Sequence, residues 1–347
     1  MRWPDLVAGL VRRDDLEPEA ARWAMSQILA GSVTPVQVAA FAVALRAKRE
    51  TVDEVMALAE AMLDVATSID LDQEAVDIVG SGADRANTVN VSTMAAVVAA
   101  AAGARVVKHG NRAASSMCGT ADVLETVGVA IDVAPQRQPA VFAATDLVFL
   151  FAPLYHPALR HAATARRELG IATTFNFLGP LTNPARPRAR AVGVADLRMA
   201  ELMAGVLARS GCRGLVFHGD DGLDELTTTT TSRVWVIGEH QVRPDELDPA
   251  TIGIPRAAKA HLVGGPPERN AEVVRETLAG VRGPVRDIVL LNAAAALVAY
   301  HGPDRRPVAE QLAQHLEEAA AAIDSGAATR LLQRWVDVTQ EQRAASA

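Results

Sequence analysis

From residue 76 onward, the chain repeats one pattern: a short apolar run rich in valine, followed by a longer segment with helical spacing. Strands that are apolar throughout are typical of parallel sheets covered by helices, because both of their faces are buried. We therefore predict an α/β fold with a mainly parallel central sheet flanked by helices. The predicted strands are Val76–Val79, Arg105–Val107, Leu147–Phe151, Ala191–Val194 and Leu215–Phe217.

The first part of the chain has a different pattern. Apolar residues such as Trp23, Ile28 and Val43 recur at helical spacing, and Gly31 and Pro35 mark a turn between them. We predict a small all-helical N-terminal domain over residues 1–70. The α/β domain would then occupy residues 71–347 and end in successive helices after about residue 270.

Composition excludes several classes of protein. The chain carries 34 basic and 41 acidic residues and has no long basic run, so its net charge of −7 disfavours nucleic acid as a partner. Cys118 and Cys212 fit neither a disulfide framework nor a zinc spacing. The longest apolar stretch, around residues 95–102, is too short to span a bilayer, and the N-terminus is unlike a signal peptide. We expect a cytoplasmic protein with no membrane association.

The first predicted strand runs into a glycine loop, Gly80–Asp84, and residues Asn90–Thr93 then open an alanine-rich helix. Glycines let the backbone approach a ligand, and free N–H groups at a helix start favour an anion such as phosphate. The loop lacks the third glycine of a dinucleotide fingerprint and the Gly-Lys-Ser/Thr of a P-loop. A plain turn, with Ser92 or Asn90 capping the helix, explains the same residues equally well.

A second polar cluster, Lys108–Ser116, follows the next strand, and another helix is expected to begin near Thr120. Ligands of open α/β sheets bind at the carboxyl ends of the strands, and a lysine there can pair with phosphate. His109 has two interpretations, because a lone histidine is more often a hydrogen-bonded structural residue than a catalyst.

A third cluster, His218–Glu225, holds five side chains that can act as carboxylate or imidazole ligands. Magnesium prefers oxygen ligands and usually takes one or two carboxylates beside substrate phosphates, which suits Asp224 and Glu225. A solvated acidic turn is the alternative, and we favour the metal because two phosphate-binding loops lie elsewhere in the chain. The threonine run at residues 227–231 is predicted to be a β-prone edge segment.

A helix with three arginines follows Pro153 and His156. One of these arginines can clamp a carboxylate, but spacing alone does not choose between Arg160, Arg166 and Arg167. The histidines at 156 and 161 lack the glutamate of a His-Glu-x-x-His zinc motif, so a catalytic zinc is not expected.

The order of these motifs resembles that of the anthranilate phosphoribosyltransferases, which share a fold with pyrimidine nucleoside phosphorylases. The resemblance spans nearly the whole chain. It is carried by Gly80–Asp84, Asn87–Thr93, Lys108–Arg112, Phe175–Pro184 and Asp221–Glu225.

The resemblance implies a Mg²⁺-dependent glycosyltransferase of tryptophan biosynthesis, which joins anthranilate to phosphoribosyl pyrophosphate as a two-domain homodimer. The implied residues for phosphoribosyl pyrophosphate are Gly80, Ser81, Gly82, Ala83, Asp84, Thr88, Asn90, Val91, Ser92, Thr93, Lys108, His109, Gly110, Asn111, Arg112, Ala113, Ala114, Ser115, Ser116 and Thr120. Those for anthranilate are Gly80, Asn111, Pro153, His156 and Arg166, where the choice of Arg166 comes from the resemblance alone. The implied magnesium ligands are Ser92, Asp224 and Glu225. No acid or base is implied; Lys108, Asn111 and Arg166 would position the substrates.

The sequence departs from the family at the first loop, where Ser81 replaces threonine and Ala83 replaces a glycine. Serine keeps the hydroxyl group. If the position of Ala83 needs a positive φ, its methyl group costs on the order of 1 kcal/mol. The substitutions therefore bear on the affinity for phosphoribosyl pyrophosphate more than on the fold.

Two other functions remain open. A related enzyme could keep the donor and transfer it to a different aromatic amine or nucleobase. A non-catalytic relative could bind nucleic acid or protein on the same scaffold, but the intact polar residues of the three clusters and the negative net charge argue against it.

Overall fold

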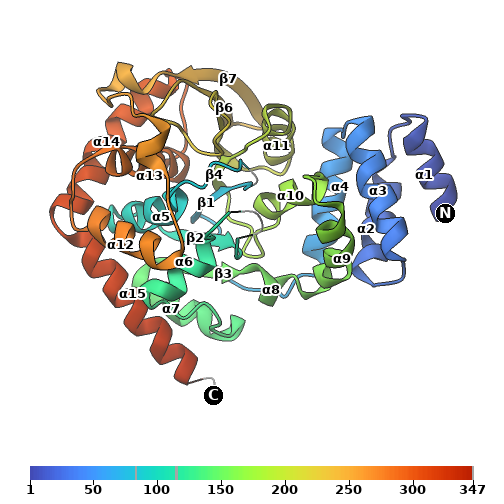
Figure 1. The fold of residues 1–347 in the computed structure, drawn as a ribbon, viewed down its shortest axis with the longest axis horizontal. Helices are drawn as coiled ribbons and strands as arrows, with labels where there is room; N and C mark the ends of the chain where they lie inside the picture. The colour runs from blue at the N-terminus through green and yellow to red at the C-terminus, as the bar shows by residue number, and fades with distance from the viewer. Residues whose placement is uncertain (83, 114–115, 346–347) are drawn as a thin grey trace.

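The computed structural model describes residues 1–82, 84–113 and 116–345 of the chain. A bundle of helices lies at one end and a larger α/β part at the other (Figure 1). The predicted fold class, a helical N-terminal part followed by an α/β part with a mostly parallel sheet, is confirmed.

The N-terminal part contains four helices: α1 (Trp3–Val11), α2 (Pro18–Leu29), α3 (Pro35–Lys48) and α4 (Val52–Asp64). Capping boxes start two of them. The side chain of Thr34 accepts a hydrogen bond from the backbone of Gln37, and that of Thr51 accepts one from the backbone of Glu54. These bonds satisfy N–H groups that a helix start leaves free, so the sequence itself fixes where α3 and α4 begin.

The sheet has seven strands in the order β3-β2-β1-β4-β5-β6-β7. The first five strands pair in parallel, and the last two are antiparallel. Their bounds are β1 (Val76–Gly80), β2 (Val106–Gly110), β3 (Leu147–Phe151), β4 (Ala189–Gly193), β5 (Arg213–Gly219), β6 (Ser232–Gly238) and β7 (Gln241–Leu247).

Helices cover both faces of the sheet. On β5, Leu215 and Phe217 belong to the core shared with α5 and α13, whereas Val216 faces the core that contains α11. This alternation is the two-residue period of a strand. The covering helices are α5 (Val91–Ala101), α6 (Thr120–Val127), α7 (Gln138–Thr145), α11 (Leu197–Arg209), α12 (Pro267–Leu278), α13 (Pro284–His301), α14 (Val308–Asp324) and α15 (Ala327–Ala344).

A segment from the middle of the chain returns to the helical bundle. After the short helix α8 (Ala152–Tyr155), α9 (Arg160–Leu169) packs against α2 and α3, and α10 (Thr174–Leu178) packs against α3 and α4 (Figure 1). The division into domains at residue 70 falls between α4 and β1 and stays a prediction.

The sequence prediction missed β6 and β7, and its interpretation of the threonine run as an edge segment is wrong. Residues 227–231 form a loop before β6. There Thr227 Oγ1 accepts a hydrogen bond from the Thr229 backbone and donates to Asp221. Such local bonds compete with the ladder of a sheet, which explains the loop. In the described part of the chain, no helix is long and apolar enough to cross a membrane.

Candidate active site

The strand order reverses direction at β1, which lies between β2 and β4. Loops that leave the carboxyl ends of strands on either side of such a reversal separate and form a crevice, where ligands of open α/β sheets bind. Gly80 and Gly193 end β1 and β4 side by side. The glycine loop after β1, the polar cluster after β2 and the acidic segment after β5 all leave the sheet at this edge.

The carboxylate of Asp224 sits in a space made by glycines. Its Oδ2 atom accepts a 2.6 Å hydrogen bond from the backbone of Gly82, which has a positive φ of 69°. A Cβ atom on Gly80 would overlap this Oδ2 atom, and one on Gly193 would overlap the backbone carbonyl of Asp224. The glycines at 80 and 193 are therefore needed for the acidic segment to reach the loop after β1.

Lys108 and Glu225 complete a buried charged group beside Asp224. The Nζ atom of Lys108 donates to the carbonyl of Ile78 at 2.6 Å and to Ser92 Oγ at 3.1 Å. The backbone N–H of Ser92 donates to the carboxylate of Glu225. Four side chains from β2, α5 and the segment after β5 thus meet in one place.

The electrostatics of this group favour a bound cation. Burial, together with the nearby charge of Asp84, raises the pKa of Asp224 to about 7, and burial and Asp224 raise the pKa of Glu225 well above its usual range. Burial lowers the pKa of Lys108 to about 8, although the carboxylates oppose that change. Closely spaced buried carboxylates repel each other unless a cation lies between them. With the hydroxyl of Ser92 they form an all-oxygen donor set, which fits Mg²⁺.

The side chain of Asn90, the residue before α5, does not cap this helix. Asn90 precedes the helix, but its amide donates to the carbonyl of Cys118 at 3.2 Å and its oxygen accepts from Asn270 at 2.8 Å. Ser92 lies inside the first turn, where its hydroxyl meets Lys108. One of the two interpretations of this segment, in which Asn90 or Ser92 caps the helix, is therefore wrong. Val91 and Thr93 lie in the same first turn.

Asp122 organises the loop between β2 and α6. Its carboxylate accepts hydrogen bonds from the backbones of Ala113 at 3.0 Å and Gly119 at 2.9 Å, and it pairs with Arg112. Arg112 also pairs with Glu125, so its charge is largely satisfied within the protein. The predicted residues Ala83, Ala114 and Ser115 lie outside the described residues.

Other predicted residues flank this loop. Asn111 is exposed, Gly110 ends β2, and Ser116 Oγ lies 3.5 Å from the carbonyl of Cys118. Thr120 is the first residue of α6, and its hydroxyl lies 3.5 Å from that of Thr93. In the loop after β1, Thr88 pairs with Val263, Ser81 Oγ accepts from the backbone of Ala195, and Asp84 Oδ1 accepts from that of Ala86.

Two buried histidines stand next to each other near α10. The rings of His109 and His156 are 5.3 Å apart, and they hydrogen-bond the carbonyls of Gly179 and Thr182 at 3.3 and 2.8 Å. Burial and the neighbouring His156 lower the pKa of His109 to about 3, and burial lowers the pKa of His156. Both rings are therefore neutral near pH 7. Within the described part of the chain, the Nε2 atom of His109 has no hydrogen-bond partner.

Arg166 lies on α9, away from the carboxylates. Its guanidinium lies 5.9 Å from the centroid of the Phe175 ring, and burial lowers its pKa. No carboxylate among the described residues pairs with it. The other arginines of α9 differ: Arg160 donates to the carbonyl of Pro157, and Arg167 is exposed. Pro153, in the short helix α8, is exposed as well.

The five candidate ligands at the end of β5 and in the segment after it have two different roles. His218, still within β5, bonds the carbonyl of Val194, Asp220 pairs with Arg233, and Asp221 bonds the hydroxyl of Thr227. These three side chains hold the turn, so only Asp224 and Glu225 of the five candidate ligands face the glycine loop.

Two features that support the site were not recognised in the sequence. One is Gly193, and a glycine inside a predicted strand is a signal of close backbone approach. The other is a buried network in which Asp77 pairs with Arg190 at 3.0 Å and accepts bonds from Asn183 and from the backbone of His109. No local pattern indicates this network, because Asp77, His109, Asn183 and Arg190 lie far apart in the sequence or in different elements.

Comparisons with known proteins agree with this geometry. The model for the α/β domain of a glycosyl transferase family matches residues 72–329, and the model for its helical bundle domain matches residues 4–66. The chain is 58% identical over 338 residues to an anthranilate phosphoribosyltransferase of Thermobifida fusca, with 97% of each chain covered.

Solved structures give the same result. The crystal structure of anthranilate phosphoribosyltransferase from Thermus thermophilus matches with a TM-score of 0.89 and 40% identity, covering 97% of this chain and 99% of that one. The Saccharomyces cerevisiae enzyme in complex with PRPP and Mg matches with a TM-score of 0.88 and 27% identity, covering 98% of both chains. The chain therefore belongs to the anthranilate phosphoribosyltransferase family.

Proposed function

We propose that this chain transfers the 5-phosphoribosyl group of phosphoribosyl pyrophosphate to the amine of anthranilate, a step of tryptophan biosynthesis that releases pyrophosphate. One observation carries the proposal: two buried carboxylates, Asp224 and Glu225, meet Lys108 and the uncapped start of α5 at the reversal point of the sheet. That combination suits a metal-bound pyrophosphate. The Saccharomyces cerevisiae relative, solved with PRPP and Mg, supports the same donor and ion here.

On the donor side, Ser92, Asp224 and Glu225 would hold Mg²⁺. When bound, the ion neutralises charge on the leaving pyrophosphate. The loop after β1 and the start of α5 would lie beside the pyrophosphate, and the positive end of the helix dipole at the start of α5 favours its negative charge. The loop after β2, which Asp122 fixes in place, would hold the ribose 5-phosphate.

The reaction is a displacement at the anomeric carbon of the ribose. The bond from this carbon to the pyrophosphate oxygen breaks, and the bond to the anthranilate nitrogen forms from the opposite face. The amine then loses one proton. Catalysis needs alignment of the two substrates and stabilisation of the leaving charge, to which the buried cation of Lys108 contributes.

On the acceptor side, Arg166 supplies a half-buried cation that no carboxylate of the described residues neutralises, which suits the carboxylate of anthranilate. His109 and His156 provide a neutral, buried wall of two rings. We place anthranilate between these residues and Gly80, Asn111 and Pro153. The acceptor would thus lie between the sheet edge and the helices that pack on the N-terminal bundle.

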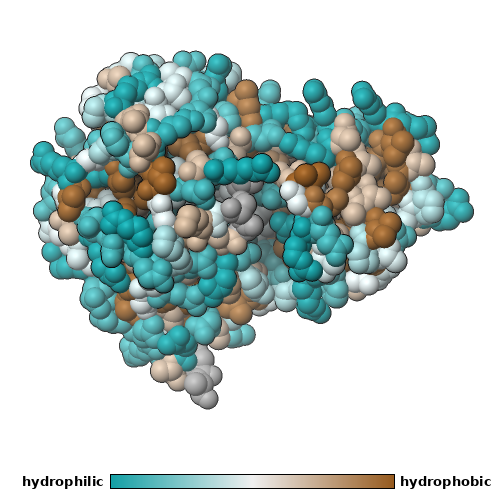
Figure 2. Space-filling view, in the orientation of Figure 1, coloured by the Kyte–Doolittle hydropathy of each residue, from teal (hydrophilic) through white to brown (hydrophobic). Residues whose placement is uncertain are grey.

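We further propose that the protein works in the cytoplasm as a homodimer that pairs through its helical bundle. Apolar side chains gather on this part of the surface, drawn brown in Figure 2. Val11 is 70% exposed and Val36 is 77% exposed, and both belong to the bundle. Exposed valines of this kind are suited to a self-complementary interface.

A fluorescence assay tests the activity. Anthranilate consumption is followed with phosphoribosyl pyrophosphate and Mg²⁺ both present and with each omitted, and turnover should require both. The same assay with other aromatic amines and nucleobases tests the alternative acceptor. Faster turnover of one of those than of anthranilate would reassign the acceptor and keep the donor.

The metal assignment has a separate test. Glu225→Gln should lower turnover and raise the Mg²⁺ concentration needed for half-maximal rate, because a neutral amide is a poorer ligand than a carboxylate. Glu246→Gln, at an exposed glutamate of β7, is the matched control and should leave both unchanged. Unchanged Mg²⁺ dependence in Glu225→Gln would reject it as a ligand.

A further inference from the structure

A second group of possible metal ligands lies at the far end of the α/β part. His301 is the last residue of α13, and His315 and Glu318 lie one turn apart on α14. They line a pocket of about 300 Å³ that also contains side chains of the connection between the two helices. None of the residues predicted for the substrates or for Mg²⁺ lines this pocket.

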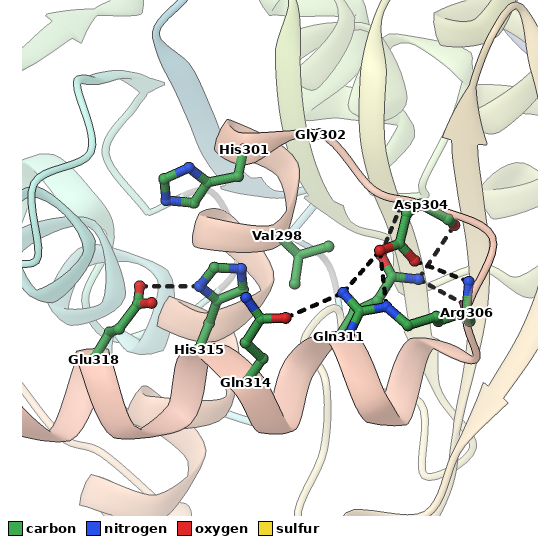
Figure 3. A pocket seen from close by; sticks show the side chains of 9 residues that line it. All are labelled: Val298, His301, Gly302, Asp304, Arg306, Gln311, Gln314, His315 and Glu318. Carbon is green, nitrogen blue, oxygen red and sulfur yellow. Dashed lines mark hydrogen bonds and ion pairs between the residues drawn. The ribbon is translucent and has the colours of Figure 1, made fainter.

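The three side chains point toward one another, as Figure 3 shows. The rings of His301 and His315 are stacked, with centroids 5.1 Å apart and planes 5° apart. The Nδ1 atom of His315 lies 3.0 Å from Glu318 Oε2. One ligand atom from each residue can be chosen so that all three lie within 4.8 Å of one another.

This donor set is suited to a transition metal rather than to magnesium. Imidazole nitrogens favour Zn²⁺ and its neighbours in the first transition row, whereas Mg²⁺ prefers oxygen ligands alone. A tetrahedral Zn²⁺, with bonds of about 2.0–2.2 Å, keeps its ligand atoms roughly 3.4 Å apart. The ligand atoms lie within 4.8 Å of one another, and the side chain of His301 is exposed and makes no hydrogen bond among the described residues.

The surroundings leave the ligands available. Within the described part of the chain, the ring nitrogens of His301 make no hydrogen bond, whereas His315 bonds only Glu318. Arg306, which also lines the pocket, pairs with Asp304 at 2.7 Å, so its charge is offset locally. Glu318 contributes one negative charge to the site. The His315 ring is mostly buried, which fixes one ligand before the ion arrives.

We propose that His301, His315 and Glu318 form a second metal site, for Zn²⁺ or a similar divalent transition metal ion, with water as the fourth ligand. The ion would link the end of α13 to α14 and thereby hold together the two ends of the loop formed by residues 302–307. That connection also touches the sheet, since the carbonyl of Arg306 accepts from Arg243 on β7. The expected effect of the ion is therefore on stability rather than on turnover, because none of the residues predicted for the substrates lines the pocket.

Zinc titration of the full-length protein tests the proposal, with Mg²⁺ in large excess so that the carboxylates of the candidate active site are occupied. Competition with a coloured chelator gives the affinity, and a thermal melt with and without Zn²⁺ gives the shift in Tm. The variant is His301→Asn, which removes an exposed ligand at the end of a helix. The matched control is His240→Asn, an exposed histidine at positive φ, a conformation that asparagine tolerates.

The wild type and His240→Asn should each bind one Zn²⁺ per chain and gain about 3 °C or more in Tm at saturating zinc. His301→Asn should bind at least about tenfold more weakly and lose most of that gain, because two ligands hold zinc less well than three. Equal zinc affinity in His301→Asn and the wild type would overturn the proposal. The proposal would also be overturned if Glu225→Gln abolished stoichiometric zinc binding and His301→Asn did not. That result would assign the zinc to the candidate active site.

Discussion

At the scale of single residues, the absence of a side chain at Gly80 is as important to the site as the carboxylates are. The space beside Gly80 and Gly193 is filled by Asp224. Glycine is thus selected here for close approach, because the φ of Gly80 itself is not in the left-handed region.

Gly80→Ala should move the carboxylate of Asp224 and lower kcat/KM for phosphoribosyl pyrophosphate by roughly 100-fold, since small displacements of positioned groups cost about this much. Steady-state kinetics at several Mg²⁺ concentrations measure the effect. Gly238→Ala is the control, because its Cβ would meet only a carbonyl 3.9 Å away. If Gly80→Ala has the kinetics of the wild type, the reaction does not depend on the observed position of the Asp224 carboxylate.

His109 connects the site to stability through its protonation. Its pKa in the folded protein, about 3, is below the ordinary value of 6.5, so the unfolded chain binds the proton more tightly. The neutral His109 ring therefore makes its full contribution to the free energy of unfolding above about pH 6.5. This contribution is lost as the pH falls toward 3.

Urea denaturation at pH 7 and pH 5 tests this expectation. Below about pH 6, the free energy of unfolding should fall by up to about 1.4 kcal/mol per pH unit more in the wild type than in His109→Gln. Glutamine can still donate to the carbonyl of Gly179 but does not titrate. Identical pH slopes for the two proteins would contradict the buried neutral histidine.

At the scale of elements, the segment from α8 to α10 links the two parts of the molecule. It leaves β3 at the sheet edge, and its helices then pack against α2, α3 and α4. Ala162 and Phe175 from this segment belong to the same core as residues of the N-terminal bundle. Arg166 is held on this segment, so its position relative to the sheet depends on how the bundle packs.

Arg166→Met should raise KM for anthranilate by roughly 10- to 100-fold, because it removes hydrogen bonds between charged groups. It should leave KM for phosphoribosyl pyrophosphate nearly unchanged. Methionine keeps much of the apolar contact with Phe175. Arg167→Met, at the exposed neighbour on α9, should change neither constant. If only KM for phosphoribosyl pyrophosphate rises, Arg166 does not belong to the anthranilate site.

At the scale of the whole molecule, charged contacts hold the bundle to the α/β part. Glu50, after α3, is buried and pairs with Arg198 on α11, and it accepts a 2.6 Å hydrogen bond from Thr174 on α10. Arg46 pairs with Asp196 just before α11. Contacts of this kind fix the orientation of the two parts between which the acceptor is proposed to bind.

The proposed dimer predicts a change of mass in solution. The wild type should elute with light scattering at twice the 36.6 kDa of one chain, and Val36→Asp with Val43→Asp should shift it toward one chain, because charges are costly in an apolar interface. Val281→Asp changes an exposed valine outside the bundle, with an exposure between those of Val36 and Val43, and should stay dimeric. A monomeric wild type would reject the dimer.

Local patterns predicted much of this molecule. The helical bundle and the five parallel strands were visible because buried strands read as apolar runs and helices repeat with their own period. The strands β6 and β7 were missed. β7 contains Pro244 and alternates in exposure at an edge of the sheet, so its apolar signal is weak.

The site was predictable in part for the same reason. Glycine loops and paired carboxylates are local in sequence, so Gly80, Asp224 and Glu225 could be named as candidates, and the resemblance to a family implied their roles. The partners of Asp220 and Asp221, which hold the turn, could not be predicted, because these two residues differ from Asp224 only in what the fold places around them.

By itself, the sequence determined the helical bundle, the five parallel strands and the chemical types of residue at the ends of those strands, because periodicity and turn residues act over a few positions. Only the tertiary structure decided which charges share one buried space, since that depends on strand order and on burial. It also brought His301 to His315 and Glu318, residues whose proximity follows from the packing of α13 against α14.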